Sequence, residues 1–213
     1  TTILWCGRFL DWKHPDDVLE AARRLRDAGY SFRFELIGTG EMEQPLKLLA
    51  SEAGLLDKNV CFLGTMSPEN VRRHMENAGI YLFTSDRREG WGAVLNEAMN
   101  SGCAVIASDA AGATPFLIKD GVNGSVYHSG SVQELYEKLR RLLDDTNLQS
   151  RLGSEAYRTI TELWNAETAA KRLLQLSQTL LSGADASRLF ADGPCSPATV
   201  SYTHLRAHET RHD

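Results

Sequence analysis

The sequence predicts an α/β fold built on a doubly wound parallel sheet. Short apolar runs alternate with amphipathic stretches of helical length, and this alternation is typical of strand–helix–strand units. The runs are continuously apolar rather than alternately apolar and polar, which indicates strands that are buried on both faces. Together the two patterns favour a sheet that is covered by helices on each side.

Each predicted strand is a short apolar run. The six runs cover residues 3–7, 32–38, 60–63, 80–84, 104–107 and 124–127. The predicted helices each have an apolar face, and they cover residues 15–28, 41–53, 93–100, 112–119, 131–145, 148–163 and 166–181. Gly29 and Gly102 end two of these helices. One further helix follows Ser67, which is suited to an N-cap, with Pro68 at its first position.

The composition excludes several classes of protein. The chain has 213 residues, of which 42% are hydrophobic and 24% charged, as in ordinary globular proteins. Its net charge of -5 gives no general attraction to nucleic acid, so we expect no nucleic-acid partner. No apolar run is long enough to span a bilayer, and residues 1–5 do not resemble a signal peptide. The expected location is therefore the cytoplasm.

Three of the four cysteines lie in apolar runs. We expect Cys6, Cys61 and Cys103 to be buried free thiols in a reducing compartment. The paired Cys or Cys/His spacing of a structural zinc site is absent from the sequence.

The last part of the chain differs from the rest. Residues 182–213 have no apolar periodicity, and we expect a non-native or disordered tail there. Residues 200–210 resemble the translation of a sequencing-library adapter, so the segment is left out of the fold prediction. For the same reason His204, His208 and His212, which are spaced four apart, are not interpreted as metal ligands. The chain also opens on a strand without Met, and we expect it to be a fragment.

The loops at the carboxyl ends of the strands are where a ligand site is expected. Such a sheet binds ligands beyond these ends. Four of the five loops contain Gly, and two contain clustered charge; they cover residues 8–14, 39–40, 64–66, 85–92 and 108–114.

The loop that follows the fourth strand contains Glu89, Gly90, Trp91 and Gly92. The two glycines let the backbone approach a ligand, and the helix that follows offers N–H groups and a positive dipole end to a diphosphate. Glu97, within this helix, can accept hydrogen bonds from a ribose diol, and Glu89 from the hydroxyls of a sugar. Taken alone, the pair is better explained by a Glu near a helix start and a solvated Glu.

The loop that follows the first strand carries two basic residues. Arg8 can contact phosphate oxygens with its planar guanidinium, and Lys13 adds a compact charge. They could neutralise a diphosphate without a metal ion, and the body of the chain has no Asp-x-Asp sequence to bind one. No metal and no cofactor are therefore expected. Seen alone, two basic residues at a helix entrance explain this motif equally well.

Two further glycine motifs are less specific. Gly38 and Gly40 resemble the start of a dinucleotide-binding fingerprint, but the third Gly of that pattern is missing. A turn is therefore favoured over an NAD site. Gly64 and the adjacent Thr65 follow the third strand, where backbone contacts to a base are expected.

In this order and spacing, the motifs resemble the C-terminal, donor-binding domain of family 4 (group 1) glycosyltransferases. That family has the GT-B fold, in which two Rossmann-like domains face each other. The matching pieces are Gly7-Arg8 with Lys13, Gly38-Thr39-Gly40, Phe62-Leu63-Gly64, Glu89-x7-Glu97, residues 98–108 and residues 120–124. They cover about Leu4 to Tyr127, and the helical pattern extends the match to about Leu181, so residues 1–181 are expected to form this domain.

The resemblance implies a retaining glycosyltransferase that transfers a sugar from a UDP- or GDP-sugar to a glycan, lipid or polysaccharide acceptor. The catalytic residues would be Arg8, Lys13 and Glu89. Arg8 and Lys13 would hold the diphosphate and Glu89 the donor sugar, whereas Glu97 would bind the ribose. The other donor-binding residues would be Gly7, Gly38, Gly40, Gly64, Thr65, Gly90, Trp91, Gly92, Ala93 and Val94. The mechanism implied is a same-face displacement, in which the leaving phosphate helps to deprotonate the acceptor hydroxyl.

The resemblance also has a departure and a gap. His14 stands where many members have Gly. The N-terminal domain, which in this family supplies the acceptor site, is missing, so we expect the chain alone to bind donor weakly and transfer little. Membrane contact, at the inner face of the membrane, would come only from that half.

Three other interpretations compete with this one. A non-catalytic module that binds a nucleotide or nucleotide sugar fits the same motifs. A GT-B-like nucleotide-sugar epimerase is disfavoured by Arg8, Lys13 and the Glu89–Glu97 segment. An NAD-binding domain is disfavoured by the incomplete Gly pattern. The tetrapeptide at residues 85–88 and the side chain of Trp91 are candidates for shaping sugar choice.

Overall fold

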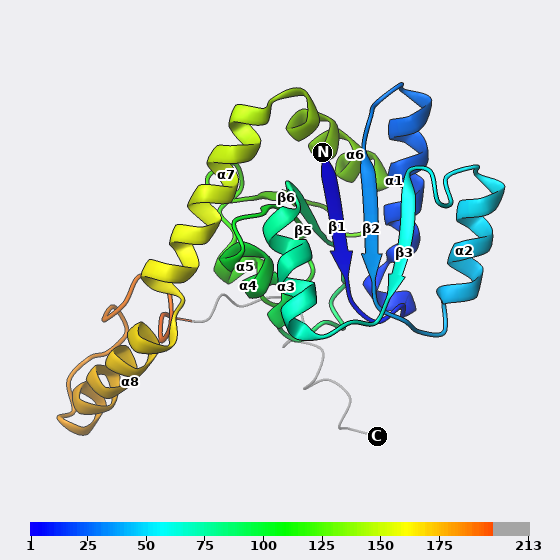
Figure 1. Ribbon diagram of the computed structural model, residues 1–213. Helices are drawn as coiled ribbons and strands as arrows, with labels where there is room; N and C mark the ends of the chain where they lie inside the picture. The colour runs from blue at the N-terminus through cyan, green and yellow to red at the C-terminus, as the bar shows by residue number, and fades with distance from the viewer. Residues whose placement is uncertain (198–213) are drawn as a thin grey trace, which may run out of the picture. The chain divides into compact units, whose positions relative to one another are not determined.

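The computed structural model describes residues 1–197, and it divides the chain into two units, Thr1–Thr161 and Glu162–Asp213. The first unit contains a six-stranded sheet in which all paired strands are parallel (Figure 1). The strands are β1 (Thr2–Cys6), β2 (Arg33–Ile37), β3 (Val60–Gly64), β4 (Ile80–Phe83), β5 (Ala104–Ser108) and β6 (Ser125–Tyr127). The α/β fold class predicted from the sequence is confirmed.

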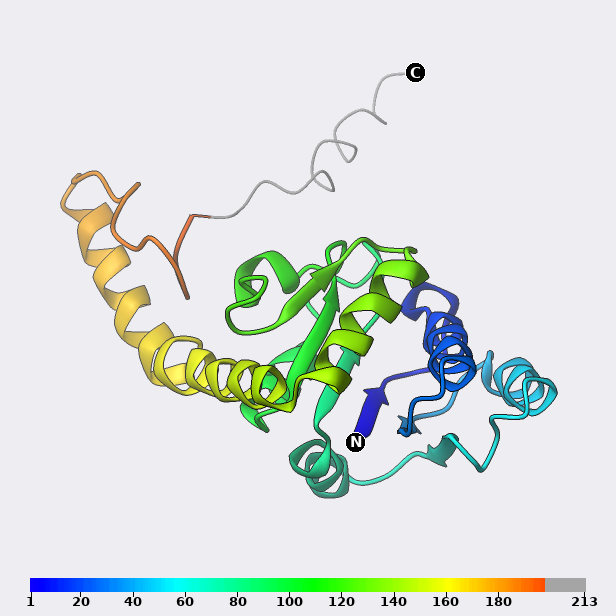
Figure 2. The same ribbon diagram turned by 90° about the horizontal axis from the view of Figure 1, so that it is seen from above.

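Helices cover both faces of this sheet (Figures 1 and 2). They are η1 (Asp11–Lys13), α1 (Pro15–Asp27), α2 (Glu43–Glu52), α3 (Pro68–Asn77), α4 (Ala93–Asn100), α5 (Thr114–Leu117), α6 (Val132–Asp144) and α7 (Thr146–Arg158). Helices α1 and α6 pack together on one face, whereas α3 and α4 pack on the other. The doubly wound arrangement is therefore the one that the alternation of apolar runs predicts.

The burial of the central strands explains why apolar runs in the sequence predict them. Every residue of β4 and β5 is buried, as continuously apolar runs indicate. The core between β1, β2 and α1 is made of large apolar side chains such as Leu25, Phe34 and Leu36, which are completely buried. The edge strand β3 is only partly buried beyond Val60. Because β3 lies at the edge of the sheet, complete burial is found in the central strands β4 and β5.

The strand order is β3-β2-β1-β4-β5-β6. The chain therefore builds the sheet outward from β1 in one direction and then, starting at β4, in the other. Ligands of open α/β sheets bind outside the carboxyl ends of the strands at such a reversal. In this chain the reversal brings the loops after β1 and β4 next to each other.

Some helix ends differ from the predicted ones. The helix predicted at 112–119 is a single turn, Thr114–Leu117, because the backbone is already extended at Ile118. The helix predicted from residue 148 begins at Thr146, where the Asp145 carboxylate accepts the N–H of Leu148 at 2.9 Å. It ends at Arg158 and continues as a π-helical turn, η2 (Thr159–Leu163). The N-cap predicted at Ser67 is confirmed, with a 3.4 Å bond from the N–H of Asn70.

The turn predicted at residues 120–124 is organised by a buried side chain. Asn123 is 4% exposed, and its amide oxygen accepts the N–H of Lys119 at 2.7 Å. Its amide nitrogen donates to the carbonyl of Leu117 at 2.8 Å and to the Thr159 hydroxyl at 2.9 Å. This single amide therefore ties the end of α5 to the end of α7, which a turn pattern alone does not reveal.

The cysteines are free, and their burial follows their place in the sheet. Cys103, in front of β5, is buried as predicted. Cys6 and Cys61 are only partly buried, which differs from the prediction. Cys6 is the last residue of β1 and faces the ligand edge, and Cys61 lies in the edge strand β3.

The second unit contains α8 (Ala166–Leu181), which begins where the Asn165 side chain accepts the N–H of Thr168 at 2.8 Å. Residues 182–197 form turns and bends, with no helix or strand among them. The three histidines and residues 200–210 lie outside the described residues. Within residues 1–197, no helix has both the length and the apolar character needed to cross a membrane.

Candidate functional site

The loops after β1 and β4 are joined by backbone and side-chain hydrogen bonds. The N–H of Asp86 donates to the carbonyl of Trp12 at 2.8 Å. The Thr84 hydroxyl donates to the carbonyl of Lys13 and accepts the indole N–H of Trp5 at 2.9 Å. Because Thr84 and Trp5 are both buried, this link is fixed to the core of the sheet.

Two residues predicted to bind the donor are in direct contact here. The ammonium group of Lys13 forms an ion pair with Oε2 of Glu89, although 76 residues separate them in sequence. Each side chain is 18% exposed, and the Ser85 hydroxyl donates to the same carboxylate oxygen at 3.3 Å. The loops thus place one cation and one anion at the mouth of the site, both within reach of solvent.

Helix α4 begins immediately after this loop. Gly92 is its N-cap and adopts a left-handed conformation with φ 80°, where a Cβ would lie 2.2 Å from the ring of Phe83. Gly90 and Ala93 are exposed, and Val94 is partly buried. The N-terminus of α4 is therefore accessible to solvent close to the Glu89 side chain, and a helix N-terminus suits an anion.

The loop is held from its other side by the segment before α5. The N–H groups of Gly112 and Ala113 donate to the carbonyls of Glu89 and Trp91, both at 3.1 Å. A Cβ at Gly112 would lie 1.8 Å from the carbonyl oxygen of Gly90, so only glycine allows this approach. Sequence reasoning did not assign a role to Gly112, because a close backbone contact leaves no local pattern.

The side chain of Trp91 is engaged within its own surroundings. Its indole N–H donates to Asn96 at 2.9 Å, and its ring lies 5.6 Å from that of Phe116. The indole is 37% exposed. Its contacts with α4 and α5 stabilise the loop.

Two adjoining cavities lie at the carboxyl ends of β1 and β3, and no residue of the loop 85–92 lines either of them. The larger has a volume of about 420 Å³ and the smaller about 200 Å³, and they share Cys6, Met66 and Val71 as lining residues. Glu97 lines the larger cavity, and the predicted donor-binding residues Gly7, Arg8, Gly38 and Thr65 line the smaller. Predicted residues from three separate loops and one helix thus line two adjoining cavities.

Gly40 and Gly64 are placed differently from the other predicted residues. A Cβ at Gly40 would lie 2.5 Å from the carbonyl oxygen of Phe9, so Gly40 packs against backbone rather than lining either cavity. The carbonyl of Gly64 accepts the N–H of Gly38 at 2.8 Å, beside the smaller cavity. Both glycines therefore hold the loops that form the cavity wall.

Cys6 forms part of the wall of both cavities, beside Glu97. Burial raises the pKa of its thiol to about 11; the nearby Glu97 carboxylate raises it further, and Lys13 opposes the shift. The thiol is therefore neutral at physiological pH, and it contributes an apolar surface rather than a nucleophile.

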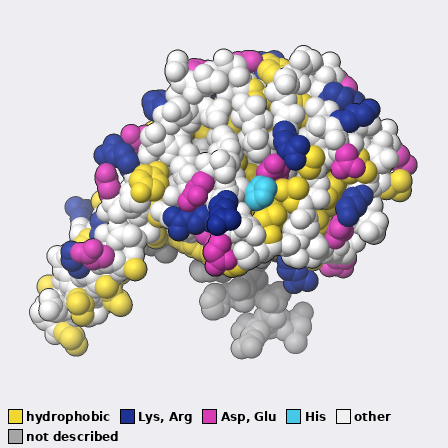
Figure 3. All heavy atoms as spheres, viewed as in Figure 1, with side chains coloured by type: hydrophobic (Ala, Val, Ile, Leu, Met, Phe, Trp, Pro, Cys, Tyr) yellow, Lys and Arg dark blue, Asp and Glu magenta, His cyan; other side chains and the backbone are white. Residues whose placement is uncertain are grey.

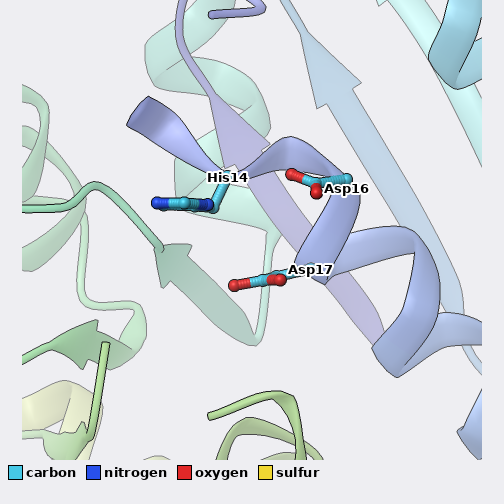
Figure 4. A group of neighbouring side chains, drawn as sticks. All are labelled: His14, Asp16 and Asp17. Carbon is cyan, nitrogen blue, oxygen red and sulfur yellow. The ribbon is translucent and has the colours of Figure 1, made fainter. Parts of the chain in front are cut away.

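His14 follows Lys13 at the place where the sequence departs from the family pattern. Its backbone is left-handed, with φ 47° and ψ 51°, a conformation that glycine adopts at no cost. The turn shape is thus preserved without the Gly. In Figure 4 the His14 side chain lies near Asp16 and Asp17, and potential ligand atoms of the three lie within 4.8 Å of one another. Asp16 is exposed, and three such groups at a helix start do not make a metal site.

The face seen in Figure 3 carries basic and acidic side chains in mixture, and neither sign gathers there into a large patch. This distribution agrees with the small net charge of the sequence. The charges of functional interest are instead the few that meet at the loops after β1 and β4.

Comparison with known proteins gives consistent results. Residues 1–159 match the family described as glycosyl transferases group 1. An uncharacterized glycosyltransferase of Methanocaldococcus jannaschii is 26% identical over 181 residues, which cover 84% of this chain and 45% of that protein. The chain spans about half the length, or less, of the curated relatives that it matches.

Two solved structures extend the comparison. HepE of Anabaena in complex with UDP superposes with a TM-score of 0.72 at 25% identity, and the match covers 85% of this chain and 48% of HepE. The C-terminal domain of a group 1 family glycosyl transferase from Francisella tularensis gives a TM-score of 0.67 at 29% identity, covering 76% of this chain and 84% of that domain.

Proposed function

The chain belongs to the group 1 glycosyl transferases, and from that premise we propose that it is the donor-binding half of a retaining enzyme. The donor would be a UDP- or GDP-sugar, and the acceptor a glycan, a lipid or a polysaccharide. The observation that carries the proposal is the meeting of Lys13 and Glu89 at the N-terminus of α4, beside a cavity lined by Glu97.

Each part of the donor has a matching surface. The larger cavity, of about 420 Å³, is large enough for a nucleoside, and the Glu97 carboxylate would accept hydrogen bonds from the ribose hydroxyls. The diphosphate would lie between the N-terminus of α4 and the two cations, Arg8 and Lys13. The sugar would then reach Glu89. The likeness to HepE, which was solved in complex with UDP, supports a nucleoside diphosphate as the ligand.

Catalysis would rest on charge stabilisation. As the bond from the sugar to the diphosphate breaks, negative charge grows on the leaving phosphate, and the fixed positive groups around it lower the barrier. The acceptor hydroxyl would attack from the same face and pass its proton to that phosphate, so the anomeric configuration is retained. These residues supply the charge without a metal ion.

The acceptor site is proposed to lie in the part of the relatives that this chain does not match. For that reason we expect the chain by itself to bind donor and to transfer little sugar. An assay of the isolated chain that showed rapid transfer would contradict this.

The direct test is ligand-dependent thermal stability. A ligand that binds only the folded state raises the melting temperature, by an amount that grows with the logarithm of the ratio of its concentration to its Kd. We expect UDP or GDP at millimolar concentration to raise the melting temperature by several degrees, and NAD to leave it unchanged. A shift with NAD alone would support the dinucleotide-binding alternative, and no shift with UDP or GDP would overturn the proposal.

The Lys13–Glu89 ion pair makes a prediction about ligands with and without the sugar. In the ligand-free site the diphosphate must compete with Glu89 for Lys13, and the carboxylate also repels it. Glu89→Gln removes both effects while keeping the shape of the side chain. We expect the affinity for UDP or GDP to rise about threefold to tenfold, and the affinity for the matching nucleotide sugar to rise less or to fall.

Calorimetric titration measures both affinities. The matched control is Glu52→Gln, an equal charge change on an exposed residue of α2 for which we expect no effect. If Glu89→Gln weakened the binding of the free nucleotide, the carboxylate would be needed to hold Lys13 in place rather than competing for it.

A further inference from the structure

We propose that Arg88 is a positioning residue, which sets Lys13 relative to Glu89 by clamping the loop after β4 to the η1 segment. The inference rests on the proposed function, because the consequence of the clamp is the binding of a donor diphosphate. Arg88 lies next to Glu89 in sequence, and the clamp reaches residues next to Lys13.

The clamp begins within the loop. The N–H of Arg88 donates to Oδ1 of Asp86 at 2.8 Å, and its guanidinium donates to both carboxylate oxygens of Asp86 at 3.0–3.3 Å. The carbonyl of Asp86 accepts the N–H of Glu89 at 3.0 Å. Asp86 therefore closes a tight turn, and Glu89 is the residue at which that turn ends.

The same guanidinium crosses to η1. It donates to Oδ2 of Asp11 at 3.1 Å, and it lies over the ring of Trp12 at 5.4 Å from the ring centre. The N–H of Asp86 donates to the carbonyl of Trp12, and the imidazole of His14 lies 3.6 Å from Asp86. Residues on both sides of Lys13 are thus held to the loop that carries Glu89.

The pKa of Asp86 agrees with its contacts to Arg88. Partial burial raises the pKa of Asp86, but hydrogen bonds from the side chain and backbone of Arg88 outweigh burial and lower it. A single exposed ion pair contributes little to stability. Here one planar cation makes contacts with two carboxylates and an aromatic ring, so the value of the clamp lies in geometry more than in energy.

We expect removal of the Arg88 clamp to make the positions of Lys13 and Glu89 less precise without unfolding the chain. Neither segment is a regular helix or strand of more than one turn, so the clamp replaces the constraint that secondary structure provides elsewhere. Without it, the segment that carries Lys13 is no longer held in one position, and a diphosphate would no longer meet a preformed cation. Positions of charged groups matter at the scale of an ångström in such sites.

The experiment compares three variants by calorimetric titration with UDP and with GDP. We expect Arg88→Ala to lower the affinity roughly tenfold for whichever of the two nucleotides the unaltered chain binds. Arg88→Lys should restore part of the loss, because Lys keeps the charge but not the planar contacts. Arg87→Ala is the matched control, because UDP and GDP carry no donor sugar for residues 85–88 to select; Arg87 is exposed, and the structure describes no ion pair for it. We expect less than a twofold change there.

A double-mutant cycle separates positioning from a merely structural role. If Arg88 acts through Lys13, Arg88→Ala should cost little more in a Lys13→Ala background, so the two effects should not add. Additive losses, or equal effects of Arg88→Ala and Arg87→Ala while the unaltered chain binds UDP or GDP, would overturn the inference alone. Failure of the unaltered chain to bind either nucleotide would overturn the proposed function and the inference with it.

Discussion

Replacing Lys13 with alanine is expected to lower the affinity of the chain for UDP or GDP by about 100-fold. A hydrogen bond to a charged group contributes roughly 1.5–3 kcal/mol, and an ammonium beside a diphosphate can make more than one. The N–H groups at the start of α4 remain in the variant, so binding should be weakened rather than abolished. The same substitution also leaves Glu89 without its partner, as an additional negative charge facing the ligand.

The measurement is a titration with each nucleotide at constant ionic strength, because salt screens this attraction. Lys58→Ala provides the control, since Lys58 is exposed and lies before β3, away from the described cavities. Equal affinities of the Lys13 and Lys58 variants would mean that Lys13 serves the structure of the loop and does not contact phosphate. Arg8, which lines the smaller cavity, is expected to give a smaller loss in the same assay.

The location of the site could be predicted from the sequence because it depends on regular elements. Alternating apolar runs indicate a parallel sheet, and a parallel sheet has one edge at which ligands bind. Glu97 lies within a helix, so its spacing from Gly92 fixes its place. The order β3-β2-β1-β4-β5-β6 then brings the loops after β1 and β4 together.

The contacts within the site could not be predicted in the same way. The Lys13–Glu89 pair joins residues 76 positions apart, and its geometry depends on irregular turns organised by Asp86 and Arg88. The approach of Gly112 to Gly90 depends on the absence of a side chain, which many loop glycines share. Local sequence patterns carry no information on which of these glycines is close to another backbone.

Gly38 and Gly40 form a motif that is not specific for a ligand, and the structure shows that both glycines are needed for close backbone packing. The sequence favours a turn over a dinucleotide site because the third Gly of the pattern is missing, and the residue in its place, Glu43, is the first residue of α2. Gly38 is in the conformation φ 135°, and a Cβ there would lie 1.9 Å from the carbonyl oxygen of Gly7. The close approach joins the loops after β1 and β2, and it forms a wall of the smaller cavity.

Gly38→Ala is therefore expected to be the most damaging single substitution among the glycines of the site. Two costs combine: a backbone conformation that L residues avoid, and a collision with backbone that no side-chain rotation can relieve. We expect a loss of at least about 3 kcal/mol in the free energy of unfolding, measured by urea denaturation of the chain.

Gly29→Ala separates the two costs. Gly29 also has a positive φ, 83°, but no atom lies within 4 Å of a Cβ built there. Its substitution should cost only the conformational part, about 1 kcal/mol. The difference between the two variants then measures the collision with Gly7, and equal losses would show that the loops after β1 and β2 can move apart freely. If they cannot, the spacing of Gly7 and Gly38 is a steric requirement of the cavity wall, whichever nucleotide occupies it.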